Sequence, residues 1–459
     1  MVLYRILCLS AILLSSSLYA QQAQHPAVEN WRRNLNETKG QSNISNIHAM
    51  VSQIEADVQT TFYDNDYAYV EATGIPSHLI GPFTGDGNPG IPGDREHIWR
   101  ITLDPQPAQT PVRVGLGAIG FFLNGVAMFN AEDARSWNNQ GIWKRNAVFF
   151  ERLGFGVGMG HPAGDFYHYH QGPTLLMNQL GENRINHSPL MGFGLDGFPV
   201  YGPYGYSNSN GTGGIRLITP SWQHRNISQR RTLPDGTNLN QNQWGPDVSA
   251  TYPIGAFIED HEFVQGSGDL DEHNGRFCVT PEYPQGTYAY FITQNAQGES
   301  LYPYIIGPTY YGEPDTANGG GGGGGGPGGP GGPGGPGGPG GGGVTIPPNA
   351  TQFIPFEIYT NNVNAGDTAT IAIGGAVPTT PVFLGYSISG SGPTQTVYGV
   401  VEMSLPINSL GPFTANNNGL VEITSVVPTQ LLGRTIWAQS LNIASGSSNI
   451  SLPAKMTIQ

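Results

Sequence analysis

Apolar and polar residues alternate with a period of two along much of this chain, and glycine and proline interrupt the alternation at short intervals. Side chains on a β-strand point alternately to the two faces of a sheet, so this pattern predicts short, half-buried strands separated by turns. It therefore predicts a mainly β fold, a β-rich barrel or sandwich with minor helix. The clearest runs are Thr60–Val70, His97–Leu103, Val112–Phe129, Thr287–Thr293 and Tyr302–Ile306.

Three local patterns add detail to this β-rich region. The residues Ala118–Asn130 predict a β-hairpin that turns at Asn124-Gly125, because these two residue types tolerate positive φ. Apolar positions at helical spacing predict a helix within residues 44–54. A further short helix is predicted over Trp143–Leu153, with Gly154 just beyond its end.

A change in composition divides the chain after the β-rich region. Residues 319–343 contain only glycine and proline, which predicts a flexible linker between two bodies. From Val344 to Gln459 only six residues are charged, none is histidine or cysteine, and alternating apolar runs recur between turns. This pattern predicts a small antiparallel β-sandwich, residues 344–459, that serves in binding, spacing or surface attachment.

The N-terminus is typical of an export signal. Arg5 precedes an apolar and small-residue core from Ile6 to Ser17, so residues 1–20 are predicted to be a signal peptide cleaved after Ala20. Residues 21–59 form a polar, partly helical segment, and the β-rich domain is expected over residues 60–315. No other run has the length of a membrane span. The mature protein is expected to be secreted, periplasmic or on the cell surface.

Charge and cysteine content narrow the possible partners. The formal net charge is -14, with 19 basic residues, which argues against nucleic acid or an anionic membrane as a partner. After signal removal only Cys278 remains, so no intramolecular disulfide is available. Because apolar residues flank it, Cys278 is interpreted as a small buried hydrophobe.

The most informative stretch centres on Tyr167-His168-Tyr169-His170. On a strand, residues two apart lie on one face at about 6 to 7 Å between Cα atoms, so both imidazoles could reach one ion. A helix would turn the two rings to nearly opposite sides. The spacing therefore predicts a chelating pair, His168 and His170, provided that the segment is extended.

Further donors lie nearby, namely His161, Asp165, His187 and Asp196. Imidazole combined with carboxylate suits zinc, copper, iron or manganese better than calcium, which prefers oxygen ligands. The predicted metal ligands are the four histidines, and the spacing does not identify the metal. The alternative is that tyrosine and histidine alternate because aromatic residues favour strands, with the histidines hydrogen-bonded or solvated.

An acidic run and a small arginine cluster are two further candidate binding sites. The run Glu259–His273 has six carboxylates and two histidines, and its Glu259–Asp271 part is a possible calcium site or a second contribution to the central metal site. It lacks the spacing of an EF-hand, and a solvated acidic loop is the alternative. Arg225, Arg230 and Arg231 could bind an anionic substrate or pair with nearby acids.

The histidine stretch resembles the YHYH-domain proteins, an exported family without an established reaction. The matching motifs are GHP at 160–162, YHYH at 167–170, HSPLMGFGLDGFPVYGPYG at 187–205, and the segments 270–291 and 302–312. The resemblance extends from Leu116 to Gly312. The resemblance therefore supports the boundaries of the domain, but it implies little about a mechanism.

Two classes of function remain open at this point. In the first, the exported protein binds a metal ion through its histidines without catalysis, and its partner is a small molecule, a glycan or a surface polymer. In the second, it is a metal-dependent hydrolytic or redox enzyme. Asp165 or Asp196 would then orient a ligand or act as general base on water at the ion. No GxSxG, HExxH or nucleotide-binding signature favours another enzyme class.

Overall fold

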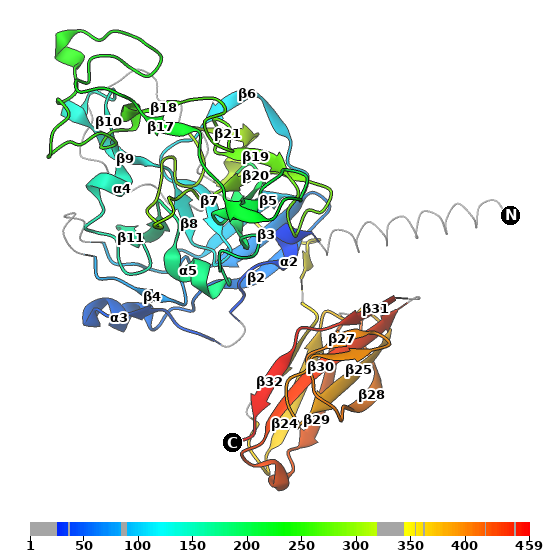
Figure 1. Cartoon of the computed structure of the whole chain (residues 1–459). Helices are drawn as coiled ribbons and strands as arrows, with labels where there is room; N and C mark the ends of the chain where they lie inside the picture. The colour runs from blue at the N-terminus through cyan, green and yellow to red at the C-terminus, as the bar shows by residue number, and fades with distance from the viewer. Residues whose placement is uncertain are drawn as a thin grey trace. The chain divides into compact units, whose positions relative to one another are not determined.

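The computed structural model describes residues 25–34, 37–83, 90–318, 344–353, 355–360, 363–417, 419–444 and 447–459. The predicted signal peptide, residues 1–20, and the glycine-proline run, residues 319–343, lie outside these ranges. The chain divides into two compact units, residues 1–352 and 353–459. Both consist mainly of β-strands, as the alternating pattern predicts (Figure 1).

The first unit is built on an open eight-stranded sheet whose edge strands, within the described residues, are β11 and β19. Its strands, in spatial order, are β11 (Gly160–Ala163), β12 (Phe166–Tyr169), β8 (Ala127–Phe129), β7 (Ala118–Phe122), β13 (Leu190–Gly194), β14 (Pro199–Tyr201), β20 (Thr287–Phe291) and β19 (Gly275–Cys278). Every residue of β12, β13 and β14 is buried, so both faces of this part of the sheet are covered.

A four-stranded sheet belongs to the same unit, with the order β22 (Thr351–Gln352), β2 (Val58–Tyr63), β3 (Tyr67–Ala72) and β5 (His97–Thr102). Trp99 of β5 stacks on Phe121 of β7 with ring centroids 4.8 Å apart, which joins the two sheets. Trp31 stacks on the same Phe121 at 5.7 Å, so the N-terminal segment packs on this core as well. The two-residue strand β22 follows the glycine-proline run in sequence and pairs with Phe62 and Tyr63 of β2.

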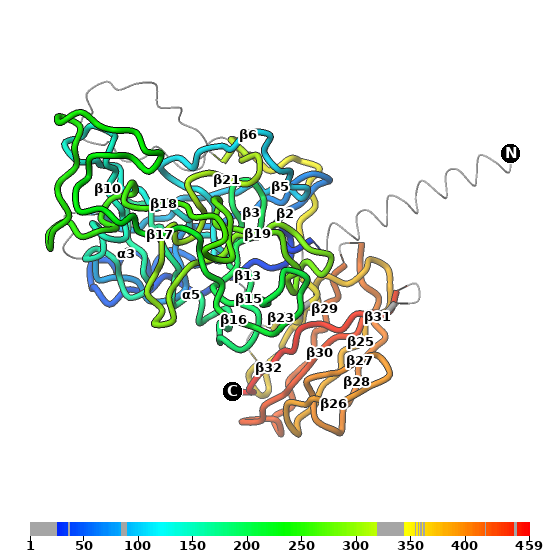
Figure 2. The backbone as a smooth tube through the Cα atoms, turned by 45° about the horizontal axis from the view of Figure 1, so that its top comes forward, coloured from blue at the N-terminus to red at the C-terminus, as the bar shows by residue number. Residues whose placement is uncertain are grey.

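Smaller pairs and short helices complete the first unit (Figure 2). The strand pairs are β1 (Gln41–Ser42) with β4 (Leu79–Ile80), β6 (Pro107–Arg113) with β21 (Thr309–Gly312), β9 (Glu132–Ser136) with β10 (Lys144–Asn146), β15 (Tyr204–Tyr206) with β16 (Ile215–Leu217), and β17 (Trp222–His224) with β18 (His261–Phe263). The helices are α2 (Pro26–Glu29), α3 (Ser45–Val51), α4 (Ala147–Phe150) and α5 (Thr174–Gln179), and 3-10 turns occupy Trp137–Asn139, Gln241–Gln243, Ile258–Asp260 and Thr316–Asn318. None of the helices in the described ranges has the length and apolar character that a membrane span requires.

The local predictions can be compared with these elements. The hairpin at 118–130 is present as β7 and β8, with Gly125 at φ +74°, while Asn124 keeps a negative φ and its side chain accepts from the Val126 backbone N–H. Of the helix predicted over residues 143–153, only the residues of α4 are helical. The helix is shorter because residues 144–146 are extended in β10, and the Asn146 side chain caps the helix at the Val148 N–H.

The second unit contains two antiparallel sheets that face each other across an apolar core. One has the order β23 (Glu357–Thr360), β24 (Thr368–Gly374) and β29 (Val421–Val426). The other has β28 (Asn408–Thr414), β25 (Pro381–Ser387), β30 (Thr435–Ala444) and β31 (Ser447–Ile450), with β32 (Ala454–Thr457) also on β30. A β26–β27 hairpin (Thr394–Thr396, Gly399–Val401) and a 3-10 turn (Thr429–Leu431) complete the unit.

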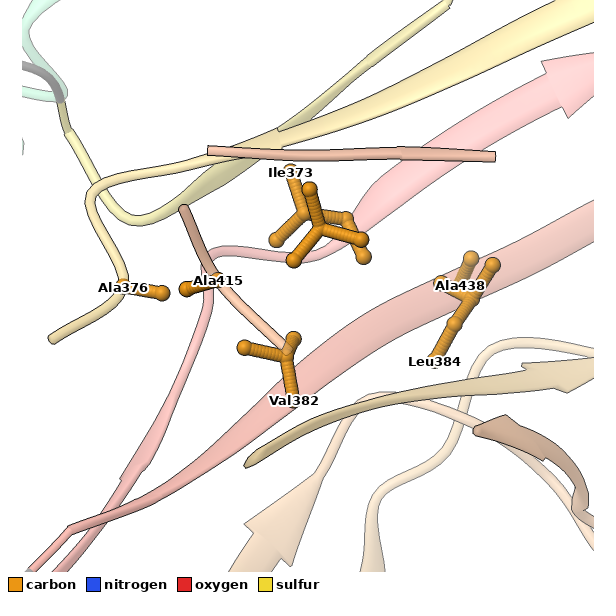
Figure 3. Close-up of a cluster of buried hydrophobic side chains, with 7 residues drawn as sticks. Ile373, Ala376, Val382, Leu384, Ala415 and Ala438 are labelled. Carbon is orange, nitrogen blue, oxygen red and sulfur yellow. The ribbon is translucent and has the colours of Figure 1, made fainter. Parts of the chain in front are cut away.

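Side chains from both sheets of this unit meet in its core, as Figure 3 shows for Ile373, Val382 and Leu384. Each of these three side chains is at most 2% exposed. Burying a side chain of this size contributes about 1.5 to 3 kcal/mol. The sandwich architecture predicted for this part of the chain follows from this packing.

A buried ion pair stabilises the loop region of the first unit between β17 and β18. Arg230 donates to both carboxylate oxygens of Asp260 at 2.7 Å, and both side chains are fully buried. Asp260 also accepts from the Gly255 and Phe257 backbone N–H groups. The basic cluster predicted around Arg230 therefore includes an internal structural pair.

We predict that Asp260→Ala lowers the free energy of unfolding by about 3 to 5 kcal/mol, because it leaves the Arg230 guanidinium buried without a counter-charge. Urea unfolding followed by tryptophan fluorescence measures this change. Glu55→Ala is the control, since it breaks a half-exposed pair with Lys39 and should cost only about 0 to 1 kcal/mol. Equal losses in the two variants would contradict the prediction.

Candidate metal centre

The candidate centre is formed by the hairpin of β11 and β12, at one edge of the eight-stranded sheet. In its antiparallel register His161 lies directly opposite His168, and Gly164 takes φ +66° in the connecting turn. On its other side β12 pairs in parallel with β8, where His168 lies beside Ala127. The extended conformation on which the predicted chelating pair depends is therefore present.

The two residue types of the YHYH motif lie on opposite faces of β12. His168 and His170 approach each other on one face, with 3.1 Å between their Nε2 atoms. On the other face the Tyr169 hydroxyl donates to His78 Nε2 at 2.6 Å. Tyr167 and Tyr169 are at most 1% exposed. The tyrosines thus anchor the strand in the core while the histidines face the centre.

Backbone carbonyls determine which nitrogens of the two histidines carry protons. His168 Nδ1 lies 2.9 Å from the Phe166 carbonyl oxygen, and His170 Nδ1 lies 2.6 Å from that of Asn130. A carbonyl oxygen only accepts hydrogen bonds, so each Nδ1 must be the protonated donor. In the neutral rings both Nε2 atoms therefore present lone pairs. These lone pairs face each other across 3.1 Å.

Burial opposes a positive charge at this position. His168 is 2% exposed, and desolvation, followed by the neighbouring His161 and His170, lowers its pKa well below the usual 6.5. His168 is therefore neutral at pH 7. A proton on its Nε2 does not account for the close approach of the two nitrogens.

His161 and Glu151 complete the group. One ring nitrogen from each of His161, His168 and His170 lies within 4.8 Å of the others. Glu151 Oε2 lies 3.4 Å from His161 Nε2 and 3.3 Å from His170 Nε2. The Glu151 side chain is 23% exposed, whereas the His161 and His170 side chains are 3% and 4% exposed. The carboxylate is thus the member of the group closest to solvent.

Aromatic rings enclose the histidines. Phe129 stacks on His168 with ring centroids 3.8 Å apart, and Phe155 meets His161 edge-on at 4.9 Å. These rings exclude water from the inner side of the group and limit the orientations that the imidazoles can adopt. The arrangement provides three nitrogen donors and one oxygen donor in a site of low polarity.

Glu151 was not among the residues predicted from the sequence. It is the only carboxylate between Ala134 and Gly164, and it follows α4 directly, which leads toward the histidine stretch. These two features could have drawn attention to it. Its approach to the imidazoles depends on how α4 packs beside the hairpin, which no spacing in the sequence indicates.

The structure brings three of the four predicted histidine ligands together and places His187 elsewhere. Its Nδ1 donates to the Ser188 carbonyl, and its ring packs against Tyr201 and Tyr206. Tyr201 belongs to β14, which is four strands away from β12 in the sheet. At about 4.8 Å per strand, this separation is roughly 20 Å.

The two predicted carboxylates also lie outside the group. Asp165 is at the β11–β12 turn, where its side chain is 56% exposed and accepts from Arg95 at 2.5 Å. Asp196 is buried in the turn between β13 and β14. It accepts from the Tyr290 hydroxyl at 2.6 Å and from the Gly312 N–H at 2.9 Å, so it connects β14, β20 and β21.

The acidic run considered for calcium uses its carboxylates for internal contacts. Glu259 accepts from the Lys144 backbone N–H at 2.7 Å, and Asp271 accepts from the Tyr288 hydroxyl at 2.8 Å. Asp260 pairs with Arg230, and Asp269 pairs with Arg216. In the described part of the chain, the histidine triad is the only group of three or more potential ligands close enough to hold one metal ion.

A pH-dependent prediction follows from Asp196. Burial raises its pKa from 3.8 to about 6, so the folded state binds this proton more tightly than the unfolded state does. Its contribution to stability is complete below pH 3.8 and is lost as the pH rises through 6. Between pH 4 and pH 8 the wild type should therefore lose about 2.5 kcal/mol relative to Asp196→Asn. Urea unfolding of both proteins over this range tests it, and parallel pH profiles would contradict it.

Comparison with known proteins agrees with the motif. A family model described as YHYH protein matches residues 98–301, which include the β11–β12 hairpin and the Asp196 turn. Searches of curated proteins and of solved structures found no match. The motifs that resemble this family extend over residues 116–312, so the region that the family model matches begins and ends somewhat earlier. Residues 98–301 of the chain are therefore similar to the YHYH protein family and form its YHYH domain.

Proposed function

We propose that the first unit binds a divalent transition-metal ion through His161, His168 and His170, with Glu151 as a fourth ligand. The supporting observation is the 3.1 Å approach of two Nε2 atoms whose Nδ1 partners both donate to backbone carbonyls. Metal-ligating histidines are commonly oriented in this way, because the second ring nitrogen donates to a carbonyl or carboxylate. A cation beside the two lone pairs would offset their repulsion.

The donor set narrows the choice of ion. Imidazole nitrogen with a single carboxylate suits zinc, copper, iron or manganese, whereas calcium takes six to eight oxygen ligands. Copper and zinc bind such sites more tightly than manganese or iron. These two ions are therefore the first to test. Once bound, either ion would supply a concentrated positive charge at the point where the ring nitrogens meet.

Burial favours binding over catalysis. The three imidazoles are at most 4% exposed, and the aromatic rings of Phe129 and Phe155 cover them. A catalytic centre needs an open coordination position that a substrate can reach. Here Glu151 occupies the side closest to solvent. An enzyme would require this carboxylate to leave the ion, and the variant Glu151→Gln examines that possibility.

The rest of the proposed role comes from the sequence. Residues 1–20 have the character of a signal peptide, so we infer that the protein is exported and binds its ion outside the cytoplasm. Residues 344–459 offer few charges and no histidine or cysteine. This composition supports a role of the second unit in attachment to a glycan or surface polymer. It does not support a catalytic role.

The first test is elemental analysis of the purified chain, without an affinity tag, beside the double variant His168→Ala/His170→Ala. We expect one ion per chain in the triad of the wild type and loss of that ion in the double variant. His187→Ala is the matched control and should retain the ion, because His187 lies away from the triad. Circular dichroism verifies folding, and a His168→Gln/His170→Gln pair replaces the Ala variant if that variant does not fold. A wild type that takes up no ion after incubation with zinc or copper would overturn the proposal.

A second test concerns Glu151. Glu151→Gln preserves the size of the side chain but removes its charge, so metal affinity should fall by at least about tenfold while the stoichiometry stays the same. Competition against a chelator of known affinity measures this change. Unchanged affinity would exclude Glu151 as a ligand and leave an open position on the triad. That result would favour the enzyme class over the binding class.

A further inference from the structure

A second pair of histidines lies on a different part of the first unit, on the two-stranded sheet of β17 and β18 (Figures 1 and 2). His224 of β17 and His261 of β18 are direct partners in the antiparallel register. Their ring centroids are 4.9 Å apart. Directly opposed residues on neighbouring strands have Cβ atoms about 4.5 to 5.5 Å apart, which allows both imidazoles to reach one ion.

His261 is held in a single orientation. It is 3% exposed and stacks on Tyr302 with ring centroids 4.1 Å apart and an interplanar angle of 16°. Its Nδ1 lies 3.1 Å from the Ile258 carbonyl oxygen, so this nitrogen is the protonated donor. The Nε2 atom of His261 is therefore left as the acceptor. His168 and His170 show the same arrangement in the triad.

His224 contributes the exposed half of the pair. Its side chain is on the surface of β17. A Cβ on Gly255 would lie 2.6 Å from His224 Nε2, so the loop passes close to the ring and only glycine fits beside this nitrogen. Gly255 also takes φ +92°, and its N–H donates to Asp260 at 3.0 Å, which fixes the loop beside the ring.

We propose that His224 and His261 form a second metal site, separate from the triad and open to solvent. Two imidazoles on opposed strands provide a bidentate chelate for a divalent ion that prefers nitrogen donors, above all copper(II) and then zinc. His224 is exposed, so solvent reaches this side of the pair. The remaining coordination positions are available to water or to an oxygen or nitrogen donor of another molecule.

The two histidine groups differ in what surrounds them. The triad combines three buried imidazoles with a carboxylate, whereas the second pair has one buried and one exposed imidazole. With fewer ligands and solvent competition, the second site should bind more weakly and exchange its ion more readily. The second site shares no residue with the triad, so ion binding at each site can be tested separately.

The experiment is equilibrium dialysis of the full chain, without an affinity tag, against copper(II), followed by elemental analysis. In the His168→Ala/His170→Ala background, we expect one weakly held ion that is lost on adding His224→Ala. His48→Ala in the same background is the control, because His48 is a single exposed histidine on α3. Since His224 is exposed, its replacement should not impair folding.

Electron paramagnetic resonance identifies the ligands. Bound copper(II) should show coupling to two nitrogen nuclei, and this coupling should disappear in the His224→Ala variant. Equal copper uptake with and without His224→Ala would overturn the second site, and so would loss of the ion in the His48→Ala control. If the triad takes up no ion while this pair does, the proposed function fails and the second site stands.

Discussion

The Nε2 atoms of His168 and His170 approach to 3.1 Å while their Nδ1 atoms donate to carbonyl oxygens, and this geometry makes the two histidines candidate ligands of one cation. Two neutral imidazoles in this orientation direct lone pairs at each other. Burial lowers the pKa of His168, so protonation of His168 at neutral pH does not relieve the contact. The contact is suited to a cation that accepts both lone pairs, and His161 and Glu151 lie where further donors are needed.

The strand that carries these histidines is stabilised by what lies on its other face. Tyr169 donates to His78 in the core, and all four residues of β12 are buried. A strand with one polar face normally leaves that face in water. Here the hairpin with β11 and the rings of Phe129 and Phe155 cover it, so the imidazoles are enclosed. The motif thus combines a buried tyrosine anchor and a candidate ligand pair in four consecutive residues.

The position of a side chain could be predicted from the sequence where the two-residue period of a single strand determines it. The alternation of tyrosine and histidine implied that His168 and His170 share a face, and the turn after Ala163 brings His161 opposite His168. Positions could not be predicted for residues that are close in the sequence but separated by several strands of the sheet. His187 is only 17 positions after His170, but β13 and the chain around it carry His187 to the far part of the sheet. Glu151 approaches the imidazoles through tertiary packing of α4, which leaves no periodic signal.

Candidate ligands differ from structural carboxylates in whether hydrogen bonds already use their acceptor atoms. Asp196 and Asp260 are both buried, and each accepts hydrogen bonds from several neighbours, so neither has acceptor capacity directed at a common point. His168 and His170 instead use one ring nitrogen for the backbone and direct the other toward a shared position, where His161 also lies. His261 follows the triad in this respect, but its partner His224 is exposed. If such a group holds an ion, burial of the remaining donors determines whether the ion is enclosed or accessible to another molecule.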